Sequence, residues 1–249
     1  MNQFNTDESL TANVHVWIAK FDHSDNLCND YEKILTLPEK QRALRFRTPE
    51  LQLRFKMSRA ILRKILTLYL DYPVPQEIEF SINKYGKPYL SHNPKNIKFN
   101  LSHSGDLIIY GISKDFEIGV DIEHIRQESI KEPLETYVLS HSEKTIFDTL
   151  ESNQKTTAFY RIWTSKEAFV KALGVGLSKN LTEFEVSFAE FEKPKILSID
   201  GAITQTNEWS LQRIHPAPHY VGAVVVHNPS FNLHFFDYDS ENTRHIPNL

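Results

Sequence analysis

The sequence predicts an α+β protein made of two similar halves, each a small sheet packed with helices, related by a pseudo-twofold duplication. Three observations lead to this prediction. The 249 residues are 40% hydrophobic and 24% charged, which is ordinary globular composition. Segments with strand alternation are interspersed with segments of helical periodicity. The same order of segments occurs twice, displaced by roughly a hundred residues.

Each copy runs through strand, helix start, long amphipathic helix, strand–turn–strand and a pair of strands. Val16 in the first strand corresponds to Val120, Glu39 at the helix start to Glu143, and Ala60 in the long helix to Ala168. The matching segments are 14–20 with 118–124, 36–46 with 139–150, 54–66 with 160–173, 78–90 with 184–197, and 98–113 with 209–226. Chance similarity between generic strand and helix patterns is the alternative to duplication.

The repeat divides the chain into an N-terminal half at 14–117 and a C-terminal half at 118–231. Each is of a size that forms one small core, and a cleft between them is the expected ligand site. Residues 1–13 and 232–249 are polar enough to predict tails.

Composition excludes several classes of protein. No apolar run approaches the roughly 20 residues of a membrane helix, and the N-terminus lacks the basic start and apolar core of a signal peptide, so we expect a cytoplasmic protein. Cys28 is the only cysteine, which excludes an internal disulfide and a thiolate-rich metal site. Its polar surroundings, HSDNLCNDYEK, indicate a surface loop.

The net charge of −4 argues against a nucleic-acid partner, but the charges are unevenly distributed. Between Lys40 and Lys64 the basic residues face a single acid, Glu50. This segment is typical either of a solvated helix face paired with acids elsewhere or of a site that binds phosphate.

Two acids share one face of the first strand of the second copy. In GVDIE the strand period of two points the apolar side chains to the core and places Asp121 and Glu123 together on the other face. Adjacent carboxylates repel unless a cation lies between them, and a divalent ion with oxygen ligands is the natural candidate. The first copy has Trp17 and Ala19 here, so the fold does not require the acids. An exposed face with two ordinary acids is the alternative.

A third acid, Glu167, shares a helix face with Lys171. Two structural explanations compete with a functional one. Thr164 to Glu167 fit a capping box, and Glu167 with Lys171 fits a surface ion pair. Apolar periodicity continues through 159–163, which favours an uninterrupted helix over a cap.

Two turn-like segments carry potential anion contacts. NLSHSGD (100–106) follows a strand and supplies hydroxyl, imidazole and backbone N–H donors, which suit a phosphate. A hairpin turn with His103 on the surface would have the same sequence. YGKP (85–88) predicts a turn first and an anion contact second.

In order and combination, these motifs resemble the 4′-phosphopantetheinyl transferases of the large, Sfp-type class. The motifs span most of the chain: LPEK (37–40), YGKP (85–88), FNLSHSGD (99–106), IGVDIE (118–123) and FYRIWTSKEAFVKALGVGL (159–177). The resemblance implies a monomer with the duplicated α+β fold. It also implies a Mg²⁺-dependent enzyme, with Mn²⁺ as an alternative ion, that transfers the phosphopantetheine arm of coenzyme A to a serine of an apo acyl or peptidyl carrier protein. Adenosine 3′,5′-bisphosphate would leave.

The same resemblance assigns roles to single residues. Asp121, Glu123 and Glu167 would bind the metal ion, and Asp121, Glu167 and Lys171 would be catalytic, with Glu167 as the candidate base for the serine proton. The residues expected to contact coenzyme A are Lys40, Arg47, Lys87, Ser102, His103, Asp121 and Lys171. Ala43 stands where some members have a lysine, so neighbouring arginines are expected to compensate.

Two other functions fit parts of the pattern. A metal-dependent phosphohydrolase would use the same acids on a nucleotide and water. A non-catalytic module would only bind coenzyme A or an acidic protein, although the retention of all three acids argues against it. Carrier choice is expected to depend on the basic first half and on the stretch 124–138.

Overall fold

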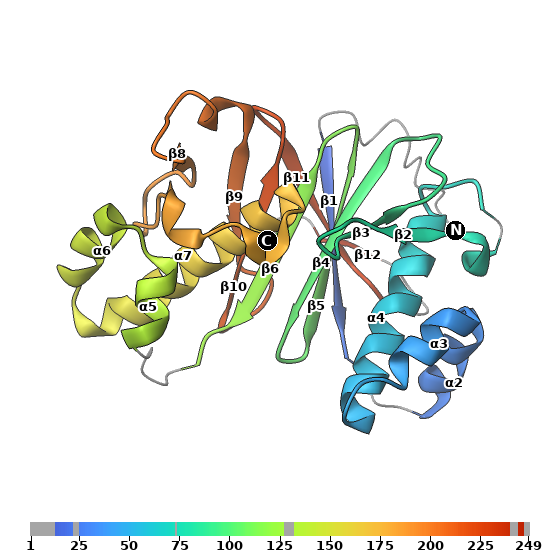
Figure 1. Ribbon diagram of the computed structural model, residues 1–249. Helices are drawn as coiled ribbons and strands as arrows, with labels where there is room; N and C mark the ends of the chain where they lie inside the picture. Colours follow the sequence, from blue (N-terminus) through green and yellow to red (C-terminus); the bar gives the residue numbers. More distant parts are fainter. Residues whose placement is uncertain (1–12, 22–24, 73, 127–131, 240–243, 247–249) are drawn as a thin grey trace.

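Helix, sheet, sheet and helix form four successive layers in the computed structural model, which describes residues 13–21, 25–72, 74–126, 132–239 and 244–246 (Figure 1). The first sheet has the strand order β12-β11-β1-β5-β4 and the second the order β6-β10-β9. Helices α2 to α4 cover the outer side of the first sheet, and α5 to α7 cover the second. The mixed α+β class predicted from the sequence is confirmed.

The element bounds are as follows. The first sheet contains β1 (Asn13–Lys20), β4 (Ile97–Ser104), β5 (Leu107–Lys114), β11 (Asn232–Asp237) and β12 (Arg244–Ile246), and the second contains β6 (Ile118–His124), β9 (Ser210–Ile214) and β10 (Tyr220–Val226). Two ribbons are formed by β2 (Phe80–Ile82) with β3 (Pro88–Leu90) and by β7 (Phe184–Val186) with β8 (Ile196–Ile199). The helices are α2 (Asp25–Ile34), α3 (Leu37–Ala43), α4 (Pro49–Thr67), α5 (Glu132–Val138), α6 (His141–Asp148) and α7 (Ser152–Leu173). Short 3₁₀ turns are η1 (Pro75–Glu77), η2 (Gly176–Ser178), η3 (Leu181–Glu183) and η4 (Thr206–Glu208).

The element order repeats as the sequence predicts. In each half a strand is followed by two short helices, a long helix, a two-stranded ribbon and two antiparallel strands. The strands pair in matching order, β1-β5-β4 in one half and β6-β10-β9 in the other. The common origin of the halves stays a prediction, and the repeated topology agrees with it.

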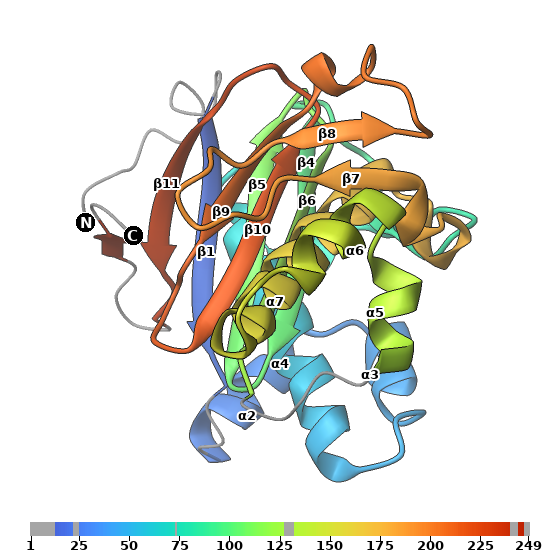
Figure 2. The same ribbon diagram turned by 90° about the vertical axis from the view of Figure 1, so that its left-hand side faces the viewer.

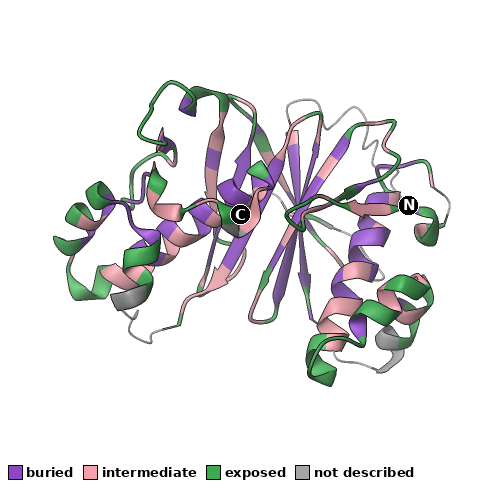
Figure 3. Ribbon diagram, in the orientation of Figure 1, coloured by how far each residue is buried: buried purple, intermediate pink, exposed green. Residues whose placement is uncertain are grey.

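Three apolar clusters hold the layers together, and the middle one lies between the two sheets. Val16 of β1 and Val120 of β6 are both fully buried in this middle cluster. Because side chains alternate along a strand, the odd-numbered neighbours of these valines face the long helices instead. Figure 3 shows the buried strands at the centre and the buried stripes of α4 and α7 that face them.

The short helices that precede the two long ones, α3 and α6, each begin with a capping box. The Glu39 carboxylate accepts a hydrogen bond from the Thr36 backbone N–H at 2.9 Å, and the Glu143 carboxylate accepts one from the Ser140 backbone N–H at 2.8 Å. In this motif the N3 glutamate satisfies a backbone donor that the helix leaves unpaired. The helix starts predicted from Glu39 and Glu143 are therefore confirmed.

The segment predicted as a C-terminal tail is instead part of the first sheet. β11 pairs with β1 in parallel register, and β12 pairs with β11 (Figure 2). The physical reason is burial of aromatic surface, since Phe235 joins the cluster between the sheets and the Phe236 ring stacks on Trp17 at 4.7 Å. The chain thus returns from the second half to the first.

Two further predictions concern the N-terminal part. Cys28 lies within helix α2 and not in a loop. Of the predicted tail at 1–13, all but Asn13 falls outside the described residues, as does 127–131 of the stretch 124–138. In the described ranges, no helix combines the length and apolar character needed to cross a membrane.

Candidate active site

The candidate site lies where helix α7 crosses strand β6 close to Gly119. A Cβ atom on Gly119 would overlap the Ala168 carbonyl oxygen and the Ala172 nitrogen. Glycine on the strand and alanine on the helix therefore let the two backbones approach each other. This close crossing brings the side chains of α7 next to those on the outer face of β6.

Glu167 lies in the middle of α7, because the helix runs without interruption from Ser152 to the left-handed cap at Gly174. The hydroxyls of Thr164 and Ser165 donate back to carbonyls of the preceding turn, as they do inside helices. The capping-box explanation of Glu167 is therefore excluded. The surface ion-pair explanation also fails, because the Lys171 ammonium pairs with Asp121.

Asp121 and Glu123 share the outer face of β6, as the strand period predicts, and strand β4 lies opposite them. The Ser102 hydroxyl donates to Asp121 Oδ1 at 2.7 Å, and the Ser104 hydroxyl donates to Glu123 Oε2 at 2.7 Å. The Asn100 side chain accepts from the Val120 backbone N–H at 2.9 Å. Alternate side chains of β4 therefore bridge the edges of the two sheets.

NLSHS thus belongs to a strand, and only Gly105 and Asp106 form the turn. The loop interpretation of 100–106 is wrong, whereas the hairpin alternative, with His103 exposed, is right. Ser104 was not singled out from the sequence. Its signal was the two-residue spacing of polar side chains at Asn100, Ser102 and Ser104.

Asp121 is the most confined of the three acids. Lys171 Nζ lies 2.6 Å from Asp121 Oδ1 and also donates to Ser102 Oγ at 2.9 Å. Asp121 is only 4% exposed, and its second oxygen, Oδ2, is buried without a hydrogen-bond partner among the described residues. A buried carboxylate oxygen without a donor is costly, so this atom is suited to a ligand.

The other two acids are held in an environment that disfavours their charge. Burial raises the pKa of Glu123 above its ordinary value, and repulsion from Asp121 adds to the rise while the Ser104 hydrogen bond opposes it. Burial also raises the pKa of Glu167, again with repulsion from Asp121 and partial relief from Lys171. Both carboxylates would ionise more readily if a cation came close.

The donor set is suited to a hard cation, since three carboxylates offer oxygen ligands and Asp121 Oδ2 is unpaired. The side chains do not yet converge as ligands. Across the described part of the chain, no group of three His, Cys, Asp or Glu side chains is arranged to hold a metal ion. The Lys171 ammonium supplies the positive charge next to Asp121 in this arrangement.

His103 points away from Ser102, to the side of β4 that faces the N-terminal half. Its ring lies edge-on to Phe21 at 6.3 Å. Burial of part of the ring lowers the pKa of His103, and the charges of Lys171 and Arg54 lower it further. His103 is therefore close enough to both Lys171 and Arg54 for their charges to disfavour its protonation.

The three other predicted phosphate contacts do not lie together. Lys40 is half-buried on α3, and Arg47 is exposed between α3 and α4. The Lys87 ammonium is bound to the Glu117 carboxylate at 3.0 Å and donates to carbonyls of β6 and α7, including that of Ala172 at 3.0 Å. Lys87 therefore ties the ribbon to the end of α7.

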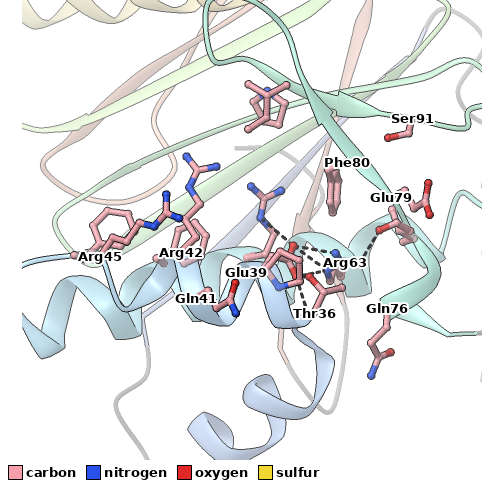
Figure 4. Close-up of a pocket in the computed structure, with 17 residues that line it drawn as sticks. Thr36, Glu39, Gln41, Arg42, Arg45, Arg63, Gln76, Glu79, Phe80 and Ser91 are labelled. Carbon is pink, nitrogen blue, oxygen red and sulfur yellow. Dashed lines mark hydrogen bonds and ion pairs between the residues drawn. The ribbon is translucent and has the colours of Figure 1, made fainter.

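A cavity of about 980 Å³ among α3, α4 and the β2–β3 ribbon is lined by arginines and aromatic rings (Figure 4). Its basic residues are Arg42, Arg45, Arg59 and Arg63, and its rings are Phe46, Phe55 and Phe80. Arg63 is occupied by Glu39, with its Nη2 at 2.9 Å from the carboxylate. Arg59 also lies near Glu39, at 3.5 Å, but its Nη1 is buried without a partner among the described residues. We call this space the arginine cavity.

Comparisons with known proteins identify the family of the chain. Residues 117–225 match the model of the 4′-phosphopantetheinyl transferase superfamily, and residues 24–114 match the model of the 4′-phosphopantetheinyl transferase N-terminal region. The chain is similar to the 4′-phosphopantetheinyl transferase HetI of Nostoc sp., with 33% identity over 231 residues that cover 92% of this chain and 94% of that protein.

Two further relatives match over shorter stretches. A 4′-phosphopantetheinyl transferase of Bacillus subtilis is 36% identical over 51% of this chain and 55% of its own length. The human L-aminoadipate-semialdehyde dehydrogenase-phosphopantetheinyl transferase is 30% identical over 71% of this chain and 62% of its own length. Together with the two matching family models, the near full-length similarity to the Nostoc protein shows that this chain belongs to the 4′-phosphopantetheinyl transferase superfamily.

Proposed function

We propose that this phosphopantetheinyl transferase uses coenzyme A and an apo acyl or peptidyl carrier protein as its two substrates. It moves the phosphopantetheine arm to a carrier serine and releases adenosine 3′,5′-bisphosphate. The Asp121 carboxylate carries the proposal, since one oxygen is held by Ser102 and Lys171 and the other is buried and unpaired. That arrangement is suited to a cation and, beyond it, the pyrophosphate of coenzyme A.

Asp121, Glu123 and Glu167 would hold Mg²⁺, and Mn²⁺ suits the same oxygen ligands. When bound, the ion would neutralise charge on the pyrophosphate and help to fix the line of attack. Support comes from the raised pKa values of Glu123 and Glu167. A bound cation would relieve the repulsion between these acids and Asp121, which favours its binding.

Lys171 and Glu167 lie one helical turn apart on α7. We assign Lys171 to the leaving group and Glu167 to the attacking serine. The ammonium of Lys171, 29% exposed, would stay near the leaving phosphate and stabilise its charge. Glu167 makes no side-chain hydrogen bond within the described ranges, and its raised pKa suits a base that accepts the serine proton. As the serine oxygen bonds to the β-phosphorus, the bridging P–O bond breaks.

The adenosine end of coenzyme A would lie against the N-terminal half. Ser102 projects from β4 toward the acids of β6, and His103 projects from the opposite side of the strand toward Phe21. Both remain proposed contacts, as do Lys40 and Arg47. Lys87 is already engaged with Glu117, so we assign most of the 3′-phosphate binding to the arginine cavity. The unpaired Nη1 of Arg59 supports this assignment, as does the proximity of aromatic rings that suit an adenine.

Intact-protein mass spectrometry of an apo carrier protein tests the function. With coenzyme A and Mg²⁺ the carrier should gain one phosphopantetheine arm on its serine, and chelation of the metal should stop the gain. Release of nucleotide without carrier modification would identify a hydrolase instead. Unchanged carrier modification by both Asp121→Ala and Glu167→Gln would contradict the proposed mechanism.

Steady-state kinetics with coenzyme A and its 3′-dephospho form test the arginine cavity. Arg59→Gln should raise KM for coenzyme A about tenfold, the loss expected for one charge-assisted hydrogen bond, and leave KM for the dephospho form nearly unchanged. Equal effects on both substrates would place the 3′-phosphate elsewhere.

Both halves contribute side chains to the site, with Ser102 from β4 and Lys171 from α7 meeting at Asp121. We therefore propose that one chain is the complete catalytic unit. Sedimentation should find a monomer whose specific activity does not change with protein concentration.

A further inference from the structure

The turn between β4 and β5, at Gly105 and Asp106, is held from both halves of the molecule. Arg54 reaches it from α4, and Tyr220 reaches it from the start of β10. The turn directly follows Ser104, whose hydroxyl binds Glu123. A contact that fixes this turn therefore acts within a few residues of the candidate site.

Tyr220 holds the turn from the C-terminal half. Its phenolic oxygen accepts a hydrogen bond from the Asp106 backbone N–H at 3.1 Å. The same oxygen packs so closely on Gly105 that a Cβ there would collide with it, and Gly105 has φ +53°. The Tyr220 ring also lies 4.7 Å from that of His124, the residue that pairs with it at the end of β6.

Arg54 holds the turn from the N-terminal half. Its Nη1 donates to the Gly105 carbonyl at 2.5 Å, and its Nη2 lies 3.4 Å from the Asp106 carboxylate. The guanidinium lies over the Phe21 ring at 4.3 Å, and the Phe21 N–H donates to the Asp106 carbonyl at 2.9 Å. The Arg54 side chain is only 20% exposed, and its guanidinium is therefore held in place by these contacts.

Strands β4 and β6 belong to different sheets, so no ladder of backbone hydrogen bonds sets their separation. Side chains bridge them instead, through Ser102 to Asp121 and Ser104 to Glu123, and the Ser104 hydroxyl also accepts from the His124 N–H at 3.0 Å. Such bridges are short-range and would weaken steeply if β4 moved away.

We propose that Tyr220 and Arg54 are positioning residues that clamp the Gly105–Asp106 turn and thereby hold Ser102 and Ser104 against the two acids of β6. The inference rests on the proposed function, in which Asp121 and Glu123 bind the metal ion. The clamp joins the halves at the end of β4 that lies next to Ser104, and groups that orient metal ligands affect metal affinity although they do not touch the ion.

Tyr220→Phe is the sharpest test, because it removes the hydroxyl and leaves the ring against His124. Binding of Mn²⁺ to the metal-free protein, followed by electron paramagnetic resonance, should weaken about three- to tenfold, the equivalent of one hydrogen bond. Hydrogen exchange of the Asp106 and Phe21 amides should accelerate by a similar factor. Saturating Mg²⁺ should restore kcat to within about twofold, because the proposed catalytic groups are all present.

Tyr110→Phe is the matched control, since it also removes a buried tyrosine hydroxyl bond, from Tyr110 Oη on β5 to the Ser58 carbonyl on α4 at 3.0 Å, but not one to the Gly105–Asp106 turn. It should lower stability and leave Mn²⁺ binding unchanged. Arg54→Lys separates position from charge, because lysine keeps the charge and loses the two-pronged grip. It should weaken Mn²⁺ binding in the same direction as Tyr220→Phe.

Equal Mn²⁺ affinity in Tyr220→Phe and wild type would overturn the clamp, and so would a kcat loss that saturating Mg²⁺ does not restore. Failure of the proposed function would be seen differently, as wild-type Mn²⁺ binding that is absent or that survives Asp121→Asn. The two failures are therefore distinguishable in one series of measurements.

Discussion

Strands β1 and β6 hold matching places in the two halves, but the side chains that they turn toward the long helices differ in kind. On β1 the matching positions carry His15, Trp17 and Ala19, all buried, with Trp17 packed in the core beneath α4. On β6 they carry Gly119, Asp121 and Glu123. The bulky face of β1 fills the space under its helix, whereas the small glycine of β6 draws α7 close and leaves the acids facing α7 and β4. One architecture thus yields a core in one half and a site in the other.

Helices α3 and α6, in contrast to β1 and β6, use the same arrangement of side chains in both halves. The capping glutamate of each also binds a buried cation of the long helix, Arg63 for Glu39 and Lys166 for Glu143, at 2.9 and 2.6 Å. Each cation also donates to two backbone carbonyls, one of which belongs to the 3₁₀ turn at Pro75 in one half and Leu181 in the other. The comparison separates parts that hold the fold from parts that are free to carry chemistry.

The largest expected effect follows from Asp121→Asn. Loss of the charge should lower kcat/KM for carrier modification at least about 10²–10³-fold, because this carboxylate organises the cation and Lys171. The free energy of unfolding should change by only about 1 kcal/mol, since the partner lysine is 29% exposed and can be hydrated. Activity assays and urea unfolding check the two parts.

Trp17→Ala at the matching position of β1 is the control and should behave in reverse. It should cost about 3–5 kcal/mol of stability, as expected for a buried aromatic side chain. The kcat of the fraction that remains folded should stay near the wild-type value. If Asp121→Asn destabilised the protein as strongly, the division between core and site would be wrong.

Next in size is Glu143→Gln, which leaves Lys166 without a counter-charge. Burial lowers the pKa of Lys166 and raises that of Glu143, and the contact between the two at 2.6 Å opposes both shifts. Removing one partner should cost about 3–5 kcal/mol, measured by urea unfolding at low temperature. The double variant Glu143→Gln/Lys166→Met should recover part of that loss, because no unpaired charge remains.

Glu39→Gln should cost a similar amount and, unlike Glu143→Gln, should change KM for coenzyme A, because Glu39 lines the arginine cavity. If both variants lose similar stability but only Glu39→Gln changes KM for coenzyme A, the capping ion pair stabilises both halves and only the N-terminal half carries the coenzyme A cavity. Equal KM values in both variants would contradict the assignment of the cavity.

The spacing of apolar side chains and the residues typical of turns predicted much of this fold, because both depend only on residues close together in the sequence. Alternation identified β1 and β6 and the shared face of Asp121 and Glu123, and the repeated segment pattern, with Glu39 matching Glu143, identified both helix starts. Strand β11 could not be found this way, since its partner β1 lies more than 200 residues earlier and pairing depends on stacking of Phe236 on Trp17.

The sequence predicted which kinds of side chain form the candidate site, but not which of them contact each other. The sequence brought Asp121 and Lys171 into one site through a family resemblance, but not their contact, which bridges 50 residues. Lys87 was expected to meet phosphate, whereas the packed α7 places the Ala172 carbonyl at its ammonium. Nothing in YGKP itself indicates that contact. The unpaired Nη1 of Arg59 likewise depends on how residues of α3, α4 and the ribbon come together around the arginine cavity.

Gly119→Ala should have a smaller effect, about 1–3 kcal/mol, as expected when an added methyl group overpacks a tight contact. The methyl would meet the Ala168 carbonyl and force α7 away from β6. Lys171 would then move from Asp121, so kcat/KM should fall as well. Thermal unfolding and transfer assays measure both.

Gly86→Ala is the control, because nothing lies within 4 Å of its Cβ position although its φ of +94° also disfavours alanine. If both variants lost only stability, the close crossing would have no role in the site.

The pH dependence of stability should depend on a residue in the half without the acids. Burial lowers the pKa of His15 from 6.5 to about 4, with repulsion from His234 and His245 adding to the shift. The folded protein therefore binds a proton on His15 more weakly than the unfolded chain. The stabilisation is fully present above pH 6.5 and is lost as pH falls toward 4, by about 3 kcal/mol in total. His15→Gln should flatten the pH dependence of urea unfolding over this window. His92→Gln, at an exposed histidine, should keep the wild-type slope. A wild-type slope in His15→Gln would show that the acid sensitivity of the N-terminal half arises from another group.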